Sequence, residues 1–235
     1  MKVIGSDFDG TITTGKTILD STRKEIRKFR EAGNIFVIVT GRSVSKFKEG
    51  IKKYNIDFFD YVICANGSII LDSNLNCIEK NEMNHKDVEN VLNVLLDKKD
   101  KQIILNTEEN SYHIYEKNDF LNITEPILSV SLVFDSIEDR DRYSLDEISN
   151  LSVYSNNIFT DVLANGISKA TSIMKLYSNL NGNDLYTIGD GENDICMLKI
   201  SENSYTFDTS VDSVKDSAKY IFHTIDEILN EINQI

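Results

Sequence analysis

Two aspartates near the start of the chain have the type and spacing of an acid–base or metal-binding pair. In the segment KVIGSDFDGTIT, residues 2–13, Asp7 and Asp9 follow an apolar run and are separated only by Phe8. Residues two apart in an extended strand project from the same side. Two adjacent carboxylates repel unless a cation lies between them or one of them is protonated. We therefore expect a bound cation or a shared proton here.

A second acidic group follows another apolar run, in the segment LYTIGDGEND. Its residues Asp190 and Asp194 add carboxylate oxygens to those of Asp7 and Asp9. Hard oxygen ligands without sulfur or imidazole partners favour Mg²⁺ over zinc. Taken alone, the segment is also compatible with a calcium loop or an acidic turn, although it lacks the spacing of an EF-hand.

Residues suited to phosphate binding follow the remaining apolar runs. Lys169 and Arg42 are candidate cations for a phosphate, and Thr40 and the backbone amides of the glycine-containing turns can donate hydrogen bonds to its oxygens. Segments 9–10 and 40–42 are each compatible with an ordinary turn when considered separately. Because ligands bind beyond the carboxyl ends of parallel strands, we expect the strand exits to converge on one site.

The elements that must position these residues alternate between short apolar strands and amphipathic helices in both outer parts of the chain. A capping box of Thr22 and Glu25 predicts the start of one helix, and Ser43, Ser168 and Thr224 are predicted to cap three others. This alternation indicates a parallel sheet with helices on both faces. The sequence therefore predicts an α/β fold with a doubly wound, Rossmann-like parallel-sheet core.

The middle of the chain has a different pattern, which predicts an inserted α+β domain. An amphipathic helix over residues 88–96 is followed by strand-like segments at 101–106, 111–115 and 126–136. Strands that directly follow one another do not continue a doubly wound sheet. We therefore expect a core of residues 1–80 and 160–235, interrupted by a domain of residues 81–159.

The composition excludes several classes of partner. The 235 residues carry a formal net charge of −13, which argues against a nucleic acid or an anionic membrane as the main partner. No segment has the roughly 18 uninterrupted apolar residues of a membrane helix, and the N-terminus does not resemble a signal peptide. Three cysteines without metal-ligand spacing indicate a cytoplasmic protein with reduced thiols. The oligomeric state is not indicated by the sequence.

Four motifs together resemble those of a known family. The segments DFDGT, VTGR, GISK and IGDGEND are similar, in this order, to the motifs of the haloacid dehalogenase superfamily of phosphohydrolases. The long insertion between the second and third motifs, and the ANGS segment, resemble the Cof-type branch with its large α/β cap. The resemblance spans nearly the whole chain and implies that the inserted domain is a cap over the active site.

The resemblance implies a role for each motif residue. Asp7 would be the nucleophile that forms an aspartyl-phosphate, and Asp9 would be the general acid and later the general base. Thr40 would bind the phosphoryl group, and Lys169 would neutralise it. Mg²⁺ would be held by Asp7, the backbone carbonyl of Asp9, Asp190 and Asp194, the last directly or through water.

The resemblance also implies a substrate side of the site. Its expected residues are Gly41, Arg42, Asn66, Gly67 and Asn193. The sequence departs from the family pattern after the fourth motif, where a glycine-rich stretch is replaced by residues Phe207–Ser210. This difference affects the expected shape of the neighbouring loop and leaves the four core motifs intact.

The function that follows is a Mg²⁺-dependent phosphatase acting on a small phosphorylated metabolite, with a sugar phosphate as the first candidate. The sequence leaves two alternatives open. A phosphomutase or phosphotransferase would use the same aspartyl-phosphate with a different acceptor. A non-catalytic module would bind phosphometabolites without turnover.

Overall fold

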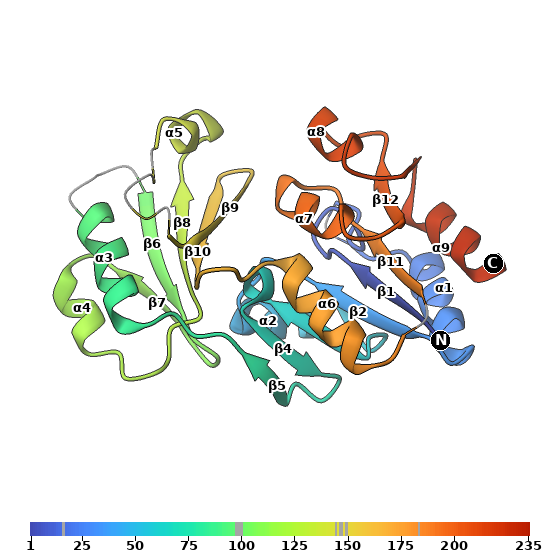
Figure 1. Cartoon of the computed structure of the whole chain (residues 1–235), viewed down its shortest axis with the longest axis horizontal. Helices are drawn as coiled ribbons and strands as arrows, with labels where there is room; N and C mark the ends of the chain where they lie inside the picture. Colours follow the sequence, from blue (N-terminus) through green and yellow to red (C-terminus); the bar gives the residue numbers. More distant parts are fainter. Residues whose placement is uncertain (16, 97–100, 144, 146–147, 149, 183) are drawn as a thin grey trace.

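Two β-sheets organise the computed structural model of the chain, which describes residues 1–15, 17–96, 101–143, 145, 148, 150–182 and 184–235. One sheet combines strands from both ends of the chain, and the other is built from the middle (Figure 1). This arrangement matches the predicted core with an inserted α+β domain.

The core sheet has eight strands in the order β13-β12-β11-β1-β2-β3-β4-β5. From β13 to β3 all neighbours are parallel, whereas β4 and β5 are added as antiparallel strands. The strands are β1 (Lys2–Ser6), β2 (Ile35–Val39), β3 (Tyr61–Cys64), β4 (Ile69–Asp72), β5 (Cys77–Lys80), β11 (Asp184–Ile188), β12 (Asn203–Phe207) and β13 (Tyr220–Phe222).

Helices cover both faces of this sheet, as the alternating pattern predicts. On one face lie α1 (Asp20–Glu31), α2 (Val44–Tyr54) and α9 (Ile225–Gln234), whose buried residues join one apolar cluster. The other face is covered by α6 (Lys169–Asn179) and α7 (Ile195–Leu198), which contribute Ile173, Leu176 and Met197 to a second cluster. The short α8 (Asp212–Lys215) follows β12. The core is therefore a three-layer α/β sandwich, with α6 in front of the sheet in Figure 1.

Three of the predicted helix caps are confirmed. The hydroxyl groups of Ser43, Ser168 and Thr224 each accept a hydrogen bond from a backbone N–H in the first turn of α2, α6 and α9. Each of these bonds satisfies a donor that the helix itself cannot pair. The cap at Ser168 determines where α6 begins, and Lys169 is its first residue.

The predicted capping box of Thr22 and Glu25 is wrong. Helix α1 begins at Asp20, three residues earlier than a cap at Thr22 predicts, and its N-cap residue Leu19 makes no side-chain capping bond. The buried hydroxyl of Thr22 donates instead to Asp226 Oδ1 of α9, at 2.6 Å. A tertiary partner that becomes available only after α1 and α9 pack together therefore takes the place of the local cap.

The second sheet is antiparallel, with the order β7-β6-β8-β10-β9. Its strands are β6 (Lys101–Asn106), β7 (Ser111–Ile114), β8 (Ser129–Phe134), β9 (Ser152–Asn156) and β10 (Phe159–Leu163), and the associated helices are α3 (His85–Leu95), α4 (Lys117–Leu121) and α5 (Ile137–Asp141). Alternate strand residues and the apolar side of α3 form a separate apolar cluster. We call this unit the cap.

The boundaries of the cap stay a prediction at the level of single residues. The hydrogen-bonded ladder includes β10 in the cap sheet up to Leu163, which favours a second boundary a few residues after the predicted position 160. Among the helices of the described residues, none is both long and apolar enough to cross a membrane.

The packing of Phe8 generates a prediction about stability. Phe8, which separates Asp7 from Asp9 in the sequence, is fully buried. Its ring lies edge-on to the rings of Phe47 and Tyr54, with centroid distances of 6.0 and 5.9 Å. We expect Phe8→Ala to lower the free energy of unfolding by about 3–5 kcal/mol, because the cavity cannot be refilled. Urea unfolding measures this. The exposed Leu121 provides the control, and a loss in Leu121→Ala as large as that in Phe8→Ala would contradict the assignment.

Candidate active site

The carboxyl ends of the parallel strands bring the predicted residues to one edge of the core sheet. Ser6 of β1 pairs with Ile38 of β2 and with Ile188 of β11, so the three strands end side by side. The backbone N–H of Asp7 continues this ladder by donating to the carbonyl of Ile188, at 2.8 Å. The parallel register therefore places the first, second and fourth motifs next to each other.

A buried lysine bridges two of the predicted aspartates. Lys169 Nζ lies 2.6 Å from Asp7 Oδ1 and 2.6 Å from Asp194 Oδ1, and all three side chains are nearly inaccessible to solvent. Burial by itself would lower the pKa of Lys169, but Asp194 and Asp7 outweigh it and hold the pKa above its usual value. Burial and the nearby Asp194 raise the pKa of Asp7 well above its ordinary range, against the effect of Lys169.

Asp190 is oriented by groups from the first and fourth motifs. Its Oδ1 accepts a hydrogen bond from the hydroxyl of Thr11, at 2.6 Å. Burial and the charge of Asp194 raise the pKa of Asp190 to about 6. Gly10 has a φ of +92°, and a Cβ at this position would lie 2.3 Å from Asp190 Oδ2. The glycine of DFDGT is therefore needed both for its backbone conformation and for the close approach of this carboxylate.

Asp194 stabilises the loop of the fourth motif as well as contacting the lysine. Its Oδ2 accepts hydrogen bonds from the backbone N–H groups of Asp190, at 3.2 Å, and of Gly191, at 3.0 Å. The two oxygens of one carboxylate thus join the loop to the N-terminus of α6. This double use explains why the side chain is almost completely buried although it is acidic.

The acidic cluster fits a divalent cation. Carboxylate oxygens of Asp7, Asp190 and Asp194 all lie within 4.8 Å of one another. These three carboxylates are accompanied by a single ammonium group, that of Lys169, so the cluster carries excess negative charge when ionised. The donor set consists of hard oxygens alone, which suits Mg²⁺ or Ca²⁺ and not a thiophilic metal.

Asp9 lies outside this cluster. Its carboxylate accepts two hydrogen bonds from Arg42, with Nε 2.7 Å from Oδ2 and Nη2 2.6 Å from Oδ1, and the side chain is 51% exposed. The guanidinium carbon of Arg42 also lies 4.8 Å from the centroid of the Phe8 ring. In this structure, Arg42 therefore contacts a carboxylate and an aromatic face, and the Asp9 carboxylate is paired with Arg42.

The second motif and the ANGS segment are joined by hydrogen bonds. The hydroxyl of Thr40 accepts from the backbone N–H of Arg42, at 3.1 Å, and its carbonyl accepts from the N–H of Asn66, at 3.1 Å. The amide of Asn66 accepts from Asn193 Nδ2, at 3.0 Å. A Cβ at Gly41 would lie 3.2 Å from the Asn66 amide. These contacts bring together Gly41, Asn66 and Asn193, three of the residues predicted to bind substrate.

Gly67 permits the close approach of two backbones. It has a φ of +117°, and a Cβ there would lie 2.3 Å from the carbonyl oxygen of Ser168. The hydroxyl of Ser172, in α6, donates to the Gly67 carbonyl at 2.6 Å. Gly67 thus determines how closely the N-terminus of α6, and with it Lys169, approaches the sheet edge.

Thr206 and the adjoining segment Phe207–Ser210, which departs from the family pattern, support the fourth motif. The buried hydroxyl of Thr206 donates to the carbonyl of Gly189, at 2.7 Å, and lies 3.0 Å from the hydroxyl of Ser210. Asp208 instead contacts His223 Nδ1, at 2.9 Å, on the exposed surface. A pair of hydroxyl groups therefore holds the backbone of the Gly189 turn in this chain.

Two residues of the site were not identified from the sequence. Thr11 belongs to the DFDGT motif, and its position next to the acidic pair was the available signal. Asp161 of β10 accepts a hydrogen bond from Asn66 Nδ2, at 2.7 Å. A carboxylate in the middle of an alternating apolar strand, eight positions before Lys169, was a signal that the pattern analysis did not use.

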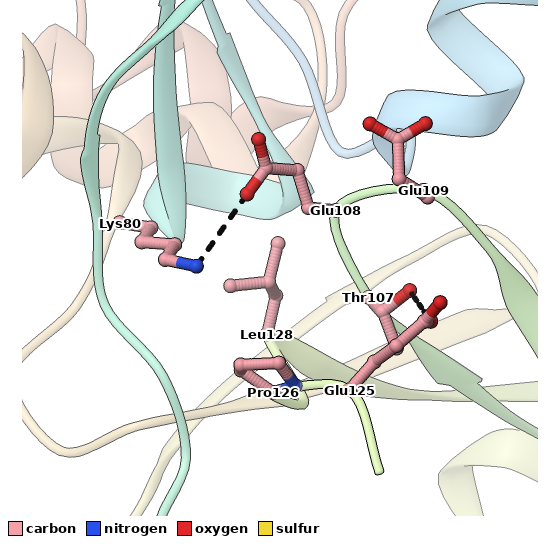
Figure 2. Close-up of a pocket in the computed structure, with 7 residues that line it drawn as sticks. All are labelled: Lys80, Thr107, Glu108, Glu109, Glu125, Pro126 and Leu128. Carbon is pink, nitrogen blue, oxygen red and sulfur yellow. Dashed lines mark hydrogen bonds and ion pairs between the residues drawn. The ribbon is translucent and has the colours of Figure 1, made fainter. Parts of the chain in front are cut away.

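A separate hollow of about 300 Å³ lies where β5 meets the cap (Figure 2). Its polar walls include Lys80, Glu108, Glu109 and Glu125, with Lys80 Nζ 3.5 Å from Glu108 Oε2. Three carboxylates and one lysine disfavour a phosphate at this position. None of the motif residues lines it, so the candidate active site remains at the carboxyl edge of the sheet.

Comparison with known proteins agrees with this architecture. A family profile for haloacid dehalogenase-like hydrolases matches residues 4–154 and 115–232. The chain is 29% identical, over 232 residues, to the 5-amino-6-(5-phospho-D-ribitylamino)uracil phosphatase YcsE of Bacillus subtilis, and the alignment covers 95% of this chain and 90% of the relative.

Solved structures share the fold at low sequence identity. The phosphatase BT1666 from Bacteroides thetaiotaomicron has a TM-score of 0.83 at 21% identity, covering 100% of this chain and 94% of that one. The subclass IIB sugar phosphatase BT4131 has a TM-score of 0.80 at 22% identity, covering 100% and 97%. The chain therefore belongs to the haloacid dehalogenase-like hydrolases, as a phosphoric monoester hydrolase of the Cof type.

Proposed function

We propose that the protein is a Mg²⁺-dependent phosphatase that transfers the phosphoryl group of a small metabolite to Asp7 and then to water. The observation that carries this proposal is the buried contact of Lys169 with Asp7 and Asp194, beside Asp190. A nucleophilic carboxylate, a fixed cation and a cluster of oxygen ligands are the groups that phosphoryl transfer requires.

The reaction has two displacements at phosphorus. A carboxylate oxygen of Asp7 forms a bond to phosphorus while the bond to the leaving oxygen breaks, and the leaving oxygen takes a proton from Asp9. Water then attacks the phosphorus of the aspartyl-phosphate, losing a proton to Asp9, and releases inorganic phosphate and free Asp7. For this role the Asp9 carboxylate must leave Arg42, because in the structure both of its oxygens accept from that guanidinium.

The charges of the site explain how two anions approach each other. Lys169 partly neutralises Asp7 in the resting site, and its ammonium group can donate to an oxygen of the incoming phosphoryl group. Mg²⁺, held by Asp7, Asp190, Asp194 and the backbone carbonyl of Asp9, would supply the remaining positive charge. Thr40, which directly follows β2, is buried and is proposed to donate its hydroxyl to the phosphoryl group.

The substrate is proposed to be a small phosphorylated metabolite with a sugar or polyol part. The support comes from relatives: YcsE is named for a phosphoribityl substrate, and BT4131 is described as a sugar phosphatase. A binding module without turnover is disfavoured because Asp7, Lys169 and Asp190 are all present and gathered at one edge. We also propose that the protein acts in the cytoplasm.

Asp7→Asn tests the nucleophile. We expect release of phosphate from p-nitrophenyl phosphate with Mg²⁺ to fall by at least about a thousandfold, because an amide does not attack phosphorus. The matched control is Asp216→Asn, which removes the same charge from an exposed position of the core. Turnover that persists in the Asp7 variant, with protein of verified purity, would reject the assigned nucleophile.

Lys169→Met tests the charge balance. Removal of the ammonium group leaves two buried carboxylates without their cation, and we expect the free energy of unfolding to fall by about 3–5 kcal/mol in metal-free buffer. Lys175→Met is the control on the same helix, since Lys175 forms an exposed ion pair with Glu79 and should contribute less than about 1 kcal/mol. Equal losses in both variants, measured by urea unfolding, would contradict the role given to Lys169.

Mg²⁺ affinity should depend on pH. Burial raises the pKa of Asp190 to about 6, so this carboxylate takes up a proton in mildly acidic solution, and burial also raises the pKa of Asp7. Binding of the cation must displace this proton, and the affinity should therefore fall at least about fourfold from roughly pH 7.5 to roughly pH 5.5. Isothermal titration calorimetry measures this, and an affinity that rises or stays constant on acidification would refute the assignment.

A further inference from the structure

The cap sheet directs toward the core a face on which polar side chains are mixed with apolar ones such as Ile104 and Val133. Along β8 and β10, the apolar residues Val130, Leu132 and Val162 point into the cap's own cluster beneath α3. Strand alternation then places Ser131 and Asp161, which are register partners, on the opposite face. Hydrogen bonds from this face to the core identify it as the side that covers the active site.

Asp161 is the one carboxylate on this face of β6 to β10. Its Oδ2 accepts from Asn66 Nδ2, at 2.7 Å, and its Oδ1 accepts from the hydroxyl of Ser131. The hydroxyl of Ser131 in turn accepts from Asn106 Nδ2, at 2.8 Å. Uncharged donors therefore hold the Asp161 carboxylate in place. This carboxylate has no role in the proposed phosphoryl-transfer steps and is not among the proposed metal ligands.

Asp161 lies on the side of the site toward which the leaving group is expected to depart. Its partner Asn66 lies directly over Gly41, next to Thr40, and the charge of Lys169 acts on Asp161. Asp7 attacks from the core side of the phosphorus. An in-line displacement therefore directs the leaving oxygen, and whatever it carries, away from the core sheet and toward the cap.

The carboxylate has capacity for another ligand. A carboxylate offers about four lone-pair positions, of which Asn66 and Ser131 each occupy one. Burial raises the pKa of Asp161 to about 6, so the group is ionised at neutral pH. The same strand face presents no lysine or arginine among its described positions, and its histidine, His113, lies exposed on the edge strand β7.

We infer, on the basis of the proposed phosphatase function, that Asp161 selects the charge of the leaving group. It accepts a hydrogen bond from a hydroxyl group of a neutral polyol, and it repels a leaving group that carries a carboxylate or a second phosphate. Rejection follows because the second anion would be held near a fixed, partly desolvated negative charge, with no lysine or arginine among the described positions of this strand face to offset it. Asp161 is thus a specificity residue and takes no part in bond making.

The experiment compares two substrates that differ in a single group. Glucitol 6-phosphate and 6-phosphogluconate share the phosphate and the polyol chain, and only the second has a carboxylate at its far end. We expect the wild-type enzyme at neutral pH to have a kcat/KM at least about tenfold higher for glucitol 6-phosphate. In Asp161→Asn, which removes the charge and keeps the shape, this ratio should shrink to within about threefold of one.

Two controls make the result specific. Asp135→Asn removes a charge from an exposed position of the same cap and should leave the ratio unchanged. Asp161→Glu keeps the charge and should retain the preference for the neutral substrate. If thermal unfolding shows that Asp161→Asn does not fold, Asp161→Ser replaces it, since its hydroxyl can still pair with Asn66 or Ser131.

The outcomes separate this inference from the proposed function. Wild-type enzyme that hydrolyses p-nitrophenyl phosphate but treats both polyol phosphates alike would overturn the role of Asp161 and leave the phosphatase proposal intact. A folded Asp161→Asn variant that keeps the wild-type ratio would also overturn it. No turnover of any of the three phosphates would remove the phosphatase proposal itself, and the inference with it.

Discussion

The whole site depends on one buried ammonium group held between two carboxylates. Lys169 contacts Asp7, directly after β1, and Asp194 of the fourth motif, so it joins three segments of the sequence. An isolated charge at this depth would be strongly unfavourable. The surrounding structure is arranged to keep the three groups together: Ser168 begins α6 at the right residue, and Gly67 lets that helix approach the sheet.

Features determined by neighbouring residues could be predicted from the sequence. The apolar runs of β1, β2 and β11, the caps at Ser43 and Ser168, and the convergence of the motifs all follow from local pattern and from the geometry of parallel strands. Features determined by distant partners could not. Thr22 of α1 contacts Asp226 of α9, and Arg42 of the second motif binds Asp9 of the first motif. Neither contact leaves a trace in sequence spacing, because each exists only after the elements pack.

The two faces of the cap sheet follow different physical rules. The face beneath α3 is filled with aliphatic side chains and makes the cap a stable unit with its own core. The face toward the active site carries serines, amides and one carboxylate beside apolar residues such as Ile104 and Val133, and it contacts the core through hydrogen bonds such as those of Ser111 with Ser43 and Ser45. Polar contacts of this kind exchange readily with water. Leu128, which is buried in the apolar cluster of the core, adds an apolar contact to these polar ones.

The short connection between the cap and Lys169 has a consequence for how such proteins diversify. Residues 164–168 alone separate the last cap strand from Lys169, and the chain enters the cap just after β5, close to Asn66 and Gly67. An exchange of caps by recombination would have to join the chains within these two short connections. A transplanted cap would then meet an unchanged lysine, so new substrate ranges can be acquired without rebuilding the machinery that breaks the phosphate bond.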